Sequence, residues 1–370
     1  MLPYFLLLAI SALLPHFLYR PADLLTENGY TILSRKRNRT MLFLFFFGFF
    51  TLLTLRDLTV GNDLIVYRSI FETCKSTRFE DLTDLQWEIG YTFYSKLFLL
   101  ISDDYRIFLM LTSVVSIWPI YRLYLREKNY AFLLIVLFLN MPCFLIIFSG
   151  LRQAIAISIG ALAYMAVSNR KYVLSALMIL LAISFHISAF ILILLFPALF
   201  IKTKTKHLAY IAPVMLIVGV FRVQILELLL AFMPNQYIEF YGDVQRTGAF
   251  GMMVLFLIFC VFSFVVLDEK TMTRKDYFMR NMLLISTVIQ FFVPIHGMVQ
   301  RASYYFLLFV PIAIVSVVQA PRRYFKDVSR FAVAVLGCFF TVYFFFNAYF
   351  SSDNLLGVFP YKFFWSGLGW

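Results

Sequence analysis

The sequence predicts an all-α protein that crosses a membrane several times, and three observations support this. Of its 370 residues, 62% are hydrophobic and only 14% are charged, whereas soluble domains are about 45 to 50% apolar. Apolar runs of about 20 residues, long enough to cross the hydrocarbon core of a bilayer, recur along the chain. Stretches such as residues 41–55 are apolar on every side, unlike the alternating strands of a transmembrane β-barrel. We therefore expect a single transmembrane domain over residues 1–370.

The apolar runs, read in order, predict about twelve spans. These lie at residues 2–19, 40–56, 107–125, 130–148, 154–168, 172–186, 188–201, 208–231, 251–267, 277–293, 302–319 and 330–350. No basic residue precedes the first run and no small-residue cleavage site follows it, which indicates a retained span rather than a signal peptide. Residues 87–102 are also apolar, but they are few and Asp103 follows them directly, so we expect a juxtamembrane or re-entrant helix there.

The charge distribution sets the expected topology. With the N-terminus outside, most of the 32 lysines and arginines fall in inward loops, as the positive-inside rule requires. Treating residues 87–102 as a full span would place most of these basic clusters outside. The net charge of +12 is therefore explained by topology and does not indicate a nucleic-acid partner. The expected outward loops are about 57–106 and 232–250.

Three arginines are candidate anion-binding residues. Arg152 and Arg301 fall at the expected outer membrane boundary, near the start of a helix, and Arg56 begins the first outward loop. A guanidinium is a planar, permanently charged group that suits phosphate oxygens, and a helix N-terminus also favours negative charge. A snorkelling interfacial arginine explains Arg152 as well. Two such residues on one face suggest a ligand that carries phosphate.

Three residues are candidate general bases. His186 lies in the apolar stretch ISFHISAF, where it is either a hydrogen-bonded core residue or a base near pH 7, oriented by Ser184 and Ser188. Asp63 and Glu88 are either ordinary loop acids or carboxylates that accept a proton from a sugar hydroxyl. The sequence does not choose among the three.

Aromatic residues near these acids are candidate sugar-binding residues. Tyr67, Trp87 and Tyr91 offer stacking faces in the first outward loop, and His296 lies at the same expected boundary. No HExxH or comparable spacing joins His186 to His296, so we expect no metal site and no cofactor.

Four motifs carry a resemblance to a known family. The run from Arg56 to Tyr67 matches FRxxxVGxDxxxY except that Leu55 stands at the first position. It is followed by E-x-G-[YF] at 88–91, S-G-[LI]-R-Q-[AS]-[IL]-A at 149–156 and F-H-x-S-A at 185–189. In this order and spacing the chain resembles the EpsG family of polysaccharide-assembly membrane proteins, relatives in role of the Wzy O-antigen and capsule polymerases. The arginine motif of some Wzy polymerases places its glycine further along than Gly160 lies from Arg152, so no residue role is carried over from it.

The resemblance, which extends over most of the chain from Arg56 to Arg301, implies a GT-C-like glycosyltransferase in a bacterial inner membrane, with its active site facing the periplasm. Its donor and acceptor would be undecaprenyl-diphosphate-linked oligosaccharides, joined with inversion into O-antigen or exopolysaccharide. Arginines would stabilise the leaving diphosphate, an electrostatic role of the kind that often dominates catalysis. Whether a chain-length regulator also binds stays open.

Two other functions remain open at this point. One is a transporter or flippase of the same lipid-linked sugars, and the other is a ligase-like transferase that uses another acceptor. Flipping requires charges through the depth of the membrane, whereas Arg152, His186 and Arg301 are all expected at one boundary. That placement favours an enzyme and predicts that these three side chains share one hollow on the outer side.

Overall fold

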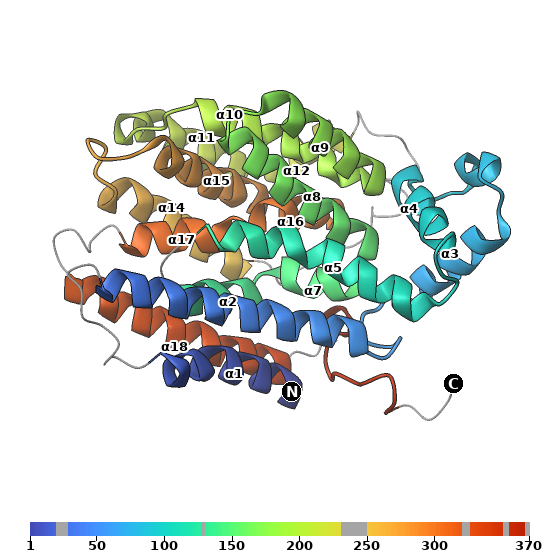
Figure 1. Cartoon of the computed structure of the whole chain (residues 1–370). Coiled ribbons are helices and arrows are strands. Elements are labelled where there is room, and N and C mark those ends of the chain that lie inside the picture. The colour runs from blue at the N-terminus through green and yellow to red at the C-terminus, as the bar shows by residue number, and fades with distance from the viewer. Residues whose placement is uncertain (20–28, 127–129, 231–249, 320–325, 351–354, 367–370) are drawn as a thin grey trace. The chain divides into compact units, whose positions relative to one another are not determined.

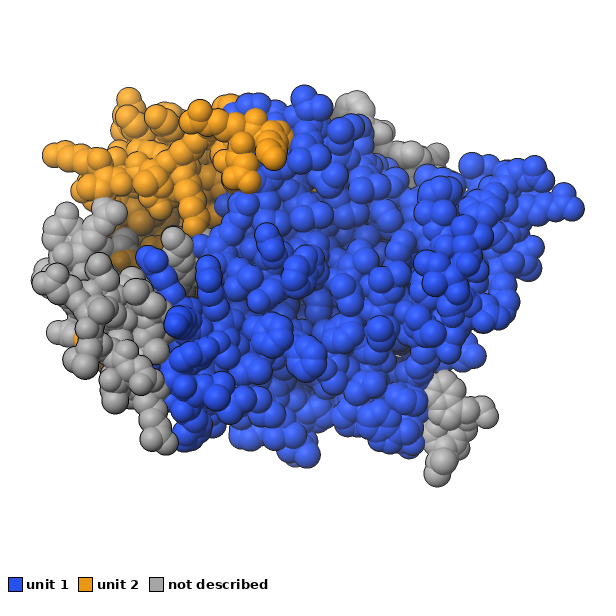
Figure 2. Space-filling model, viewed as in Figure 1, with its two compact units in different colours: residues 1–166, 172–190, 333–370 blue, residues 167–171, 191–332 orange. Residues whose placement is uncertain are grey.

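The computed structural model describes residues 1–19, 29–126, 130–230, 250–319, 326–350 and 355–366, and every regular element in these ranges is a helix. The expected all-α fold is confirmed for this part of the chain. The chain divides into two compact units, coloured separately in Figure 2. Unit 1 comprises Met1–Ala166, Tyr172–Phe190 and Val333–Trp370, and unit 2 comprises Val167–Lys171 and Ile191–Ala332.

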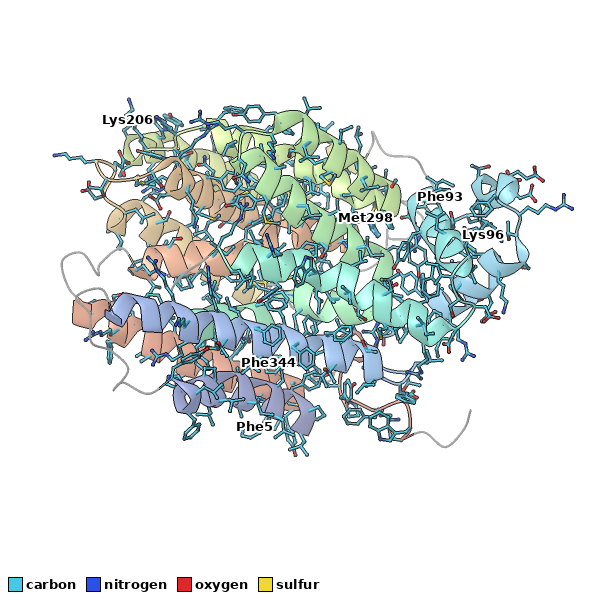
Figure 3. The ribbon with its side chains drawn as sticks, in the orientation of Figure 1. Phe5, Phe93, Lys96, Lys206, Met298 and Phe344 are labelled. Atoms are coloured by element: carbon cyan, nitrogen blue, oxygen red, sulfur yellow. The ribbon has the colours of Figure 1, made fainter. Side chains whose placement is uncertain are left out.

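Long apolar helices form the body of unit 1. α1 (Leu2–Leu18), α2 (Gly29–Leu55) and the part of α18 (Lys326–Phe350) in this unit run side by side in Figure 1, and α5 (Tyr105–Tyr124) packs on α2. Aromatic rings fill the contacts: Tyr4 packs edge to face on Phe344, which Figure 3 labels, with 6.5 Å between ring centroids. Each such pair adds about 0.5 to 1.5 kcal/mol beyond the area it buries.

The apolar run over residues 130–148 forms two helices instead of one. α6 (Ala131–Leu139) and α7 (Pro142–Ser149) meet at a bend of 63°. Proline disfavours the helical conformation for the residue before it, and Met141 is extended, with φ −87° and ψ 136°. The Asn140 side chain donates to Val136 O at 2.7 Å and to Phe340 O at 2.9 Å, which ties the break to α18. α8 (Leu151–Ser168) and α9 (Tyr172–Phe185) follow.

The first expected outward loop is helical. It contains α3 (Leu64–Ser76), the short 3₁₀ helix η2 (Glu80–Asp84) and α4 (Ile89–Leu99), so the helix expected within residues 87–102 is present. Lys96 on α4, labelled in Figure 3, donates to Cys74 O at 3.0 Å and Thr77 O at 2.5 Å. A cation on the last carbonyls of a helix is stabilising, so Lys96 fixes α4 against the end of α3.

A C-terminal strap, which we define as residues 355–366, was not among the expected elements. Its backbone pairs with the turn between α2 and α3: Asp57 N donates to Lys362 O at 2.9 Å, and Phe364 N donates to Leu55 O at 2.9 Å. The strap begins with two leucines in the left-handed region, Leu355 at φ 40° and Leu356 at φ 60°. A non-glycine residue there costs about 1 to 2 kcal/mol, so the surrounding contacts must hold the strap in place.

Unit 2 is built from shorter helices. They are the latter part of η3 (Ile187–Leu194), α10 (Leu195–Phe200), η4 (Thr205–His207), α11 (Leu208–Val220), α12 (Arg222–Leu230), α14 (Phe250–Val266), α15 (Arg274–Gln290), α16 (Gly297–Leu307) and α17 (Val310–Gln319). The buried Arg280 of α15 donates to Thr203 O at 2.9 Å and to Ser263 O at 2.7 Å. These bonds fasten α15 to the chain after α10 and to the end of α14.

The candidate membrane spans are less regular than expected. Among the described residues, four helices are long and apolar enough to cross a membrane, or up to seven if each bent pair counts as one span. Shorter apolar helices lie at Leu2–Leu18, Tyr172–Phe185, Ile187–Phe200 and Phe250–Val266. The chain is thus consistent with a multi-pass membrane protein, but the expected count of about twelve is not confirmed. The second expected loop, 232–250, lies outside the described residues except for Phe250.

Candidate functional site

A tight turn after α2 places Asp63 against the start of α8. Gly61 has φ +104°, and a Cβ on it would lie 2.5 Å from Phe148 O, so only glycine fits this approach. The turn puts Asp63, the residue before α3, beside Ser149. Ser149 Oγ lies 3.3 Å from both Asp63 Oδ2, to which it donates, and Asp63 N. Ser149 therefore holds the Asp63 carboxylate close to Gly150, the residue that precedes α8.

The centre of the candidate site is an ion pair between Arg152 and Glu88. Arg152 lies in the first turn of α8, and its Nη1 contacts Glu88 Oε2 at the N-terminus of α4. Its Nε lies 3.4 Å from the hydroxyl of Tyr67, and its Cζ lies 5.7 Å from the centre of the Tyr67 ring. The side chains of Arg152 and Glu88 are 22% and 23% exposed, so a ligand can reach the pair. Residues from α3, α4 and α8 thus meet around one guanidinium.

A second glycine brings α4 against the end of α9. A Cβ on Gly90 would lie 2.6 Å from Ser184 O, so the two backbones touch at this point. Close backbone contact is a specific use of glycine. It places Glu88, two residues earlier, next to the segment that carries His186.

His186 is buried and its hydrogen bonds select a tautomer. It is 7% exposed, its Nδ1 lies 2.7 Å from Ser188 Oγ, and Ser188 N donates to Nδ1 at 3.3 Å. An amide N–H can only donate, so Nδ1 carries a lone pair and the neutral ring holds its proton on Nε2. Ser188 thus orients His186 as expected, whereas Ser184 Oγ donates to Leu181 O.

The expected sugar-stacking residues differ in exposure. Tyr91 is fully buried and Tyr67 nearly so, with their ring centroids 5.4 Å apart, whereas Trp87 is partly exposed. Burial raises the pKa of the Tyr67 hydroxyl, opposed by the charge of Arg152, and burial also raises the pKa of Tyr91. Both hydroxyls are therefore protonated at neutral pH, and in this conformation Trp87 offers the accessible ring.

Arg301 and His296 belong to unit 2. His296 is the N-cap of α16: its Nδ1 accepts a hydrogen bond from Met298 N at 3.2 Å, and burial lowers its pKa. Arg301 is partly buried and lies one turn into α16, near the start of that helix. Arg152 and His186 lie in unit 1, so the shared hollow expected for these residues stays a prediction.

Arg56, the third expected anion-binding residue, is fully buried at the end of α2. The strap covers it through the bridge between Arg56 and Phe363. Sequence reasoning missed this strap and also missed Ser149 as the partner of Asp63. An aromatic-rich segment with Gly357 and Pro360 after the last apolar run was the available signal for the strap.

Among the described residues, no group of three or more His, Cys, Asp or Glu side chains is placed to hold a metal ion.

The fold and this arrangement define a class: an all-helical membrane protein whose accessible arginine is paired with a carboxylate at the start of a short helix. The chain belongs to the EpsG family, whose model matches residues 39–363, and is thus a polysaccharide-assembly membrane protein, as the sequence motifs suggested. The match includes all the candidate site residues and most of the strap. No curated protein and no solved structure matches the chain.

Proposed function

We propose that this protein is a membrane glycosyltransferase of the polymerase type. It would join undecaprenyl-diphosphate-linked oligosaccharide repeat units on the periplasmic side of the bacterial inner membrane, giving O-antigen or exopolysaccharide. Family membership supports a role in polysaccharide assembly. The observation that carries the chemistry is the partly exposed Arg152, held in the first turn of α8 by a carboxylate that a ligand can replace.

In the proposed reaction, a hydroxyl oxygen of the acceptor sugar attacks the anomeric carbon of the donor chain. The bond from that carbon to the diphosphate oxygen breaks, undecaprenyl diphosphate leaves, and the hydroxyl proton passes to a base. Attack opposite the leaving group inverts the anomeric centre. Arg152 would stabilise the charge that develops on the diphosphate, and the N-terminal dipole of α8 adds to this effect.

Glu88 is the base that the geometry favours. When the diphosphate replaces Glu88 at Arg152, the freed carboxylate stands beside the reacting centre and can accept the proton. Asp63 is a second candidate, but Ser149 already donates to it. His186 is disfavoured in its present hydrogen bonds, because the lone pair of Nδ1 is used by Ser188 and the proton occupies Nε2.

The remaining residues would bind the substrates. Trp87 offers a partly exposed ring for a sugar, with the Tyr67 hydroxyl beside Arg152 as a hydrogen-bond group. Arg301 and His296 would contribute to the diphosphate and sugar sites if the two units bring them together. The lipid tails would lie in the bilayer against the apolar helices.

Purified protein in detergent tests the proposal, because detergent leaves no second compartment to transport into. With lipid-diphosphate-linked repeat units as the only substrate, we expect chains longer than one unit and release of lipid diphosphate. Arg152→Ala should lower the rate about 100- to 1,000-fold, the usual loss on removal of one electrostatic stabiliser. Arg78→Ala is the matched control, because Arg78 forms an exposed pair with Glu80 in the same segment.

The product distinguishes the alternatives. If the wild-type protein makes no chains in detergent but moves lipid-linked sugars across vesicles, it is a flippase and the proposal is wrong. Transfer of a single unit to a different acceptor would instead identify a ligase-like transferase.

A further inference from the structure

Arg56 has an unusual environment for an arginine. It is fully buried, and within the part of the chain that the structure describes, none of its three guanidinium nitrogens has a hydrogen-bond partner. The guanidinium lies over the ring of Phe148, whose centre is 5.6 Å from Cζ. A buried charge normally has a partner, because removal from water is costly when nothing compensates.

Arg280 in unit 2 gives an internal comparison. It is buried to the same degree, but its Nη1 donates to Thr203 O, its Nη2 donates to Ser263 O, and Glu269 lies 3.5 Å away, so that only its Nε lacks a partner among the described residues. The chain therefore supplies a carboxylate and two carbonyls to one buried arginine and none of these to the guanidinium of the other. Arg56 is the uncompensated arginine, and it lies at the end of α2 that faces outward in the topology expected from the sequence.

The groups around Arg56 leave its positive charge unbalanced. Tyr4, Tyr105 and Tyr361 lie close enough to influence it, as does Arg106, which carries a like charge. Arg106 Nη1 donates to Arg56 O at 3.1 Å, which brings the second guanidinium to the same corner. A guanidinium stays protonated at neutral pH, so the Arg56 side chain is charged. Arg106 also lies near the carboxylates of Asp57 and Asp104, whereas the groups that influence Arg56 include no carboxylate. The buried Arg56 guanidinium is therefore the group that lacks a negative partner, and an oxyanion would supply one.

The strap closes this corner. Gly61 N donates to Gly357 O at 3.0 Å and Asn62 N to Leu356 O at 2.9 Å, in addition to the bonds at Asp57 and Phe364. The Tyr361 hydroxyl donates to Leu52 O at 2.8 Å. These few hydrogen bonds hold a segment whose first two leucines have positive φ angles. The dark-red strap lies beside the end of α2 in Figure 1.

We propose that Arg56, with Arg106 beside it, is a binding site for a phosphate-class oxyanion, and that the strap of residues 355–366 opens to admit the anion and closes over it. The site uses other residues than the Arg152–Glu88 pair, and this inference goes beyond the proposed reaction. Its ligand is the phosphate group of either a soluble diphosphate or an anionic lipid headgroup.

Hydrogen–deuterium exchange at the strap tests the site without any polymerisation. We would measure the full chain in detergent with and without inorganic diphosphate, and in nanodiscs of phosphatidylcholine with and without phosphatidylglycerol. A ligand that binds only the closed strap lowers the population of the open strap, and hence the exchange rate, about tenfold at ten times its Kd. We expect this slower exchange at the amides of Asp57, Asn62 and Phe364. An effect of diphosphate identifies the soluble source, and an effect of phosphatidylglycerol identifies the lipid headgroup.

Three variants locate the effect. Arg56→Met should abolish it and, because it removes an uncompensated charge, should melt no lower than the wild type when no anion is present. Arg152→Gln should retain the effect, which separates this site from the proposed catalytic one. Gly357→Ala should speed strap exchange and weaken the effect, because its new Cβ would lie 2.4 Å from Asn62 Oδ1.

The proposal is wrong if neither probe slows strap exchange in the wild type, or if Arg56→Met still responds. It is also wrong if Arg56→Met melts well below the wild type without anion, because Arg56 would then be stabilised by the protein itself. An unchanged response in Gly357→Ala would remove the strap from the site.

Discussion

Arg152 and Arg280 show how the surroundings of an arginine determine what it can do. Arg280 is buried and bonded to main-chain carbonyls, so it fastens helices together. Arg152 and Glu88 are mostly buried and paired with each other, and the cost of removing both charges from water offsets part of their attraction. In the proposed function a diphosphate, which carries more negative charge than a carboxylate, replaces Glu88 at Arg152, and the displaced carboxylate remains nearby.

The N-cap of α16 predicts a pH dependence of stability. Burial lowers the pKa of His296, so as the pH falls through its ordinary value of about 6.5 the unfolded chain takes up a proton more readily than the folded one. The free energy of unfolding should therefore fall below about pH 6.5. Protonation of Nδ1 would also remove the acceptor for Met298 N. Thermal unfolding in detergent at pH 5.5 and 7.5 measures this effect.

His296→Asn is the matched variant, because asparagine caps helices well and does not titrate. It should retain most of the stability at pH 7.5 and show a smaller decrease at pH 5.5. An equal decrease in both proteins would contradict the assignment of this pH dependence to His296.

At the scale of elements, two glycines bring the starts of three helices together. Gly61 allows the turn before α3 to touch Phe148 O and Gly90 allows α4 to touch the end of α9, while Arg152 joins α8 to Glu88 and Tyr67. Gly90→Ala should push α4 away from Ser184 and displace Glu88, at a cost of about 1 to 3 kcal/mol from overpacking. Polymerisation and the melting temperature of the full chain should both decrease.

Gly251→Ala is the control, because a Cβ at this helical position has no atom within 4 Å. Alanine is a better helix former than glycine by about 1 kcal/mol, so this variant should be neutral or slightly stabilised. If Gly90→Ala behaved in the same way, the close contact between α4 and α9 would not be what positions Glu88.

The sequence predicted the helices well and their breaks poorly, for physical reasons. Length and hydropathy identify an apolar run, and among the described residues each expected span overlaps helix, although the runs at 130–148, 208–231 and 302–319 each contain a bend between two helices. The bend at Met141 depends on Pro142 and on the bond from Asn140 to Phe340 O, far away in the chain. Pairing between Arg152 and Glu88 likewise joins distant segments, so the sequence could nominate these two residues but could not pair them.

The burial of individual side chains was also not predictable from the sequence. Tyr91 was expected to stack on a sugar and is fully buried, with its ring against those of Tyr67 and Phe108. Arg56 was expected at an accessible site and lies beneath the strap. Both outcomes depend on tertiary contacts that no local pattern encodes.

At the scale of the whole molecule, the candidate residues are divided between the two units. Arg152, Glu88, Asp63 and His186 belong to unit 1, and Arg301 and His296 belong to unit 2. Unit 1 alone therefore supplies a cation, two carboxylates and a partly exposed aromatic ring. In the proposed function, unit 2 adds a second arginine, so each experiment uses the full chain.

The exchange of partners at Arg152 is the central claim, and one pair of measurements on Glu88→Gln tests it most directly. Binding of a lipid-diphosphate-linked donor and the rate of chain extension would be measured with the same purified protein. A neutral amide holds Arg152 less strongly, so the donor should bind about three- to tenfold more tightly, which corresponds to roughly 1 kcal/mol. The rate of extension should fall because the base is lost. Weaker donor binding, or extension at the wild-type rate, would contradict the account.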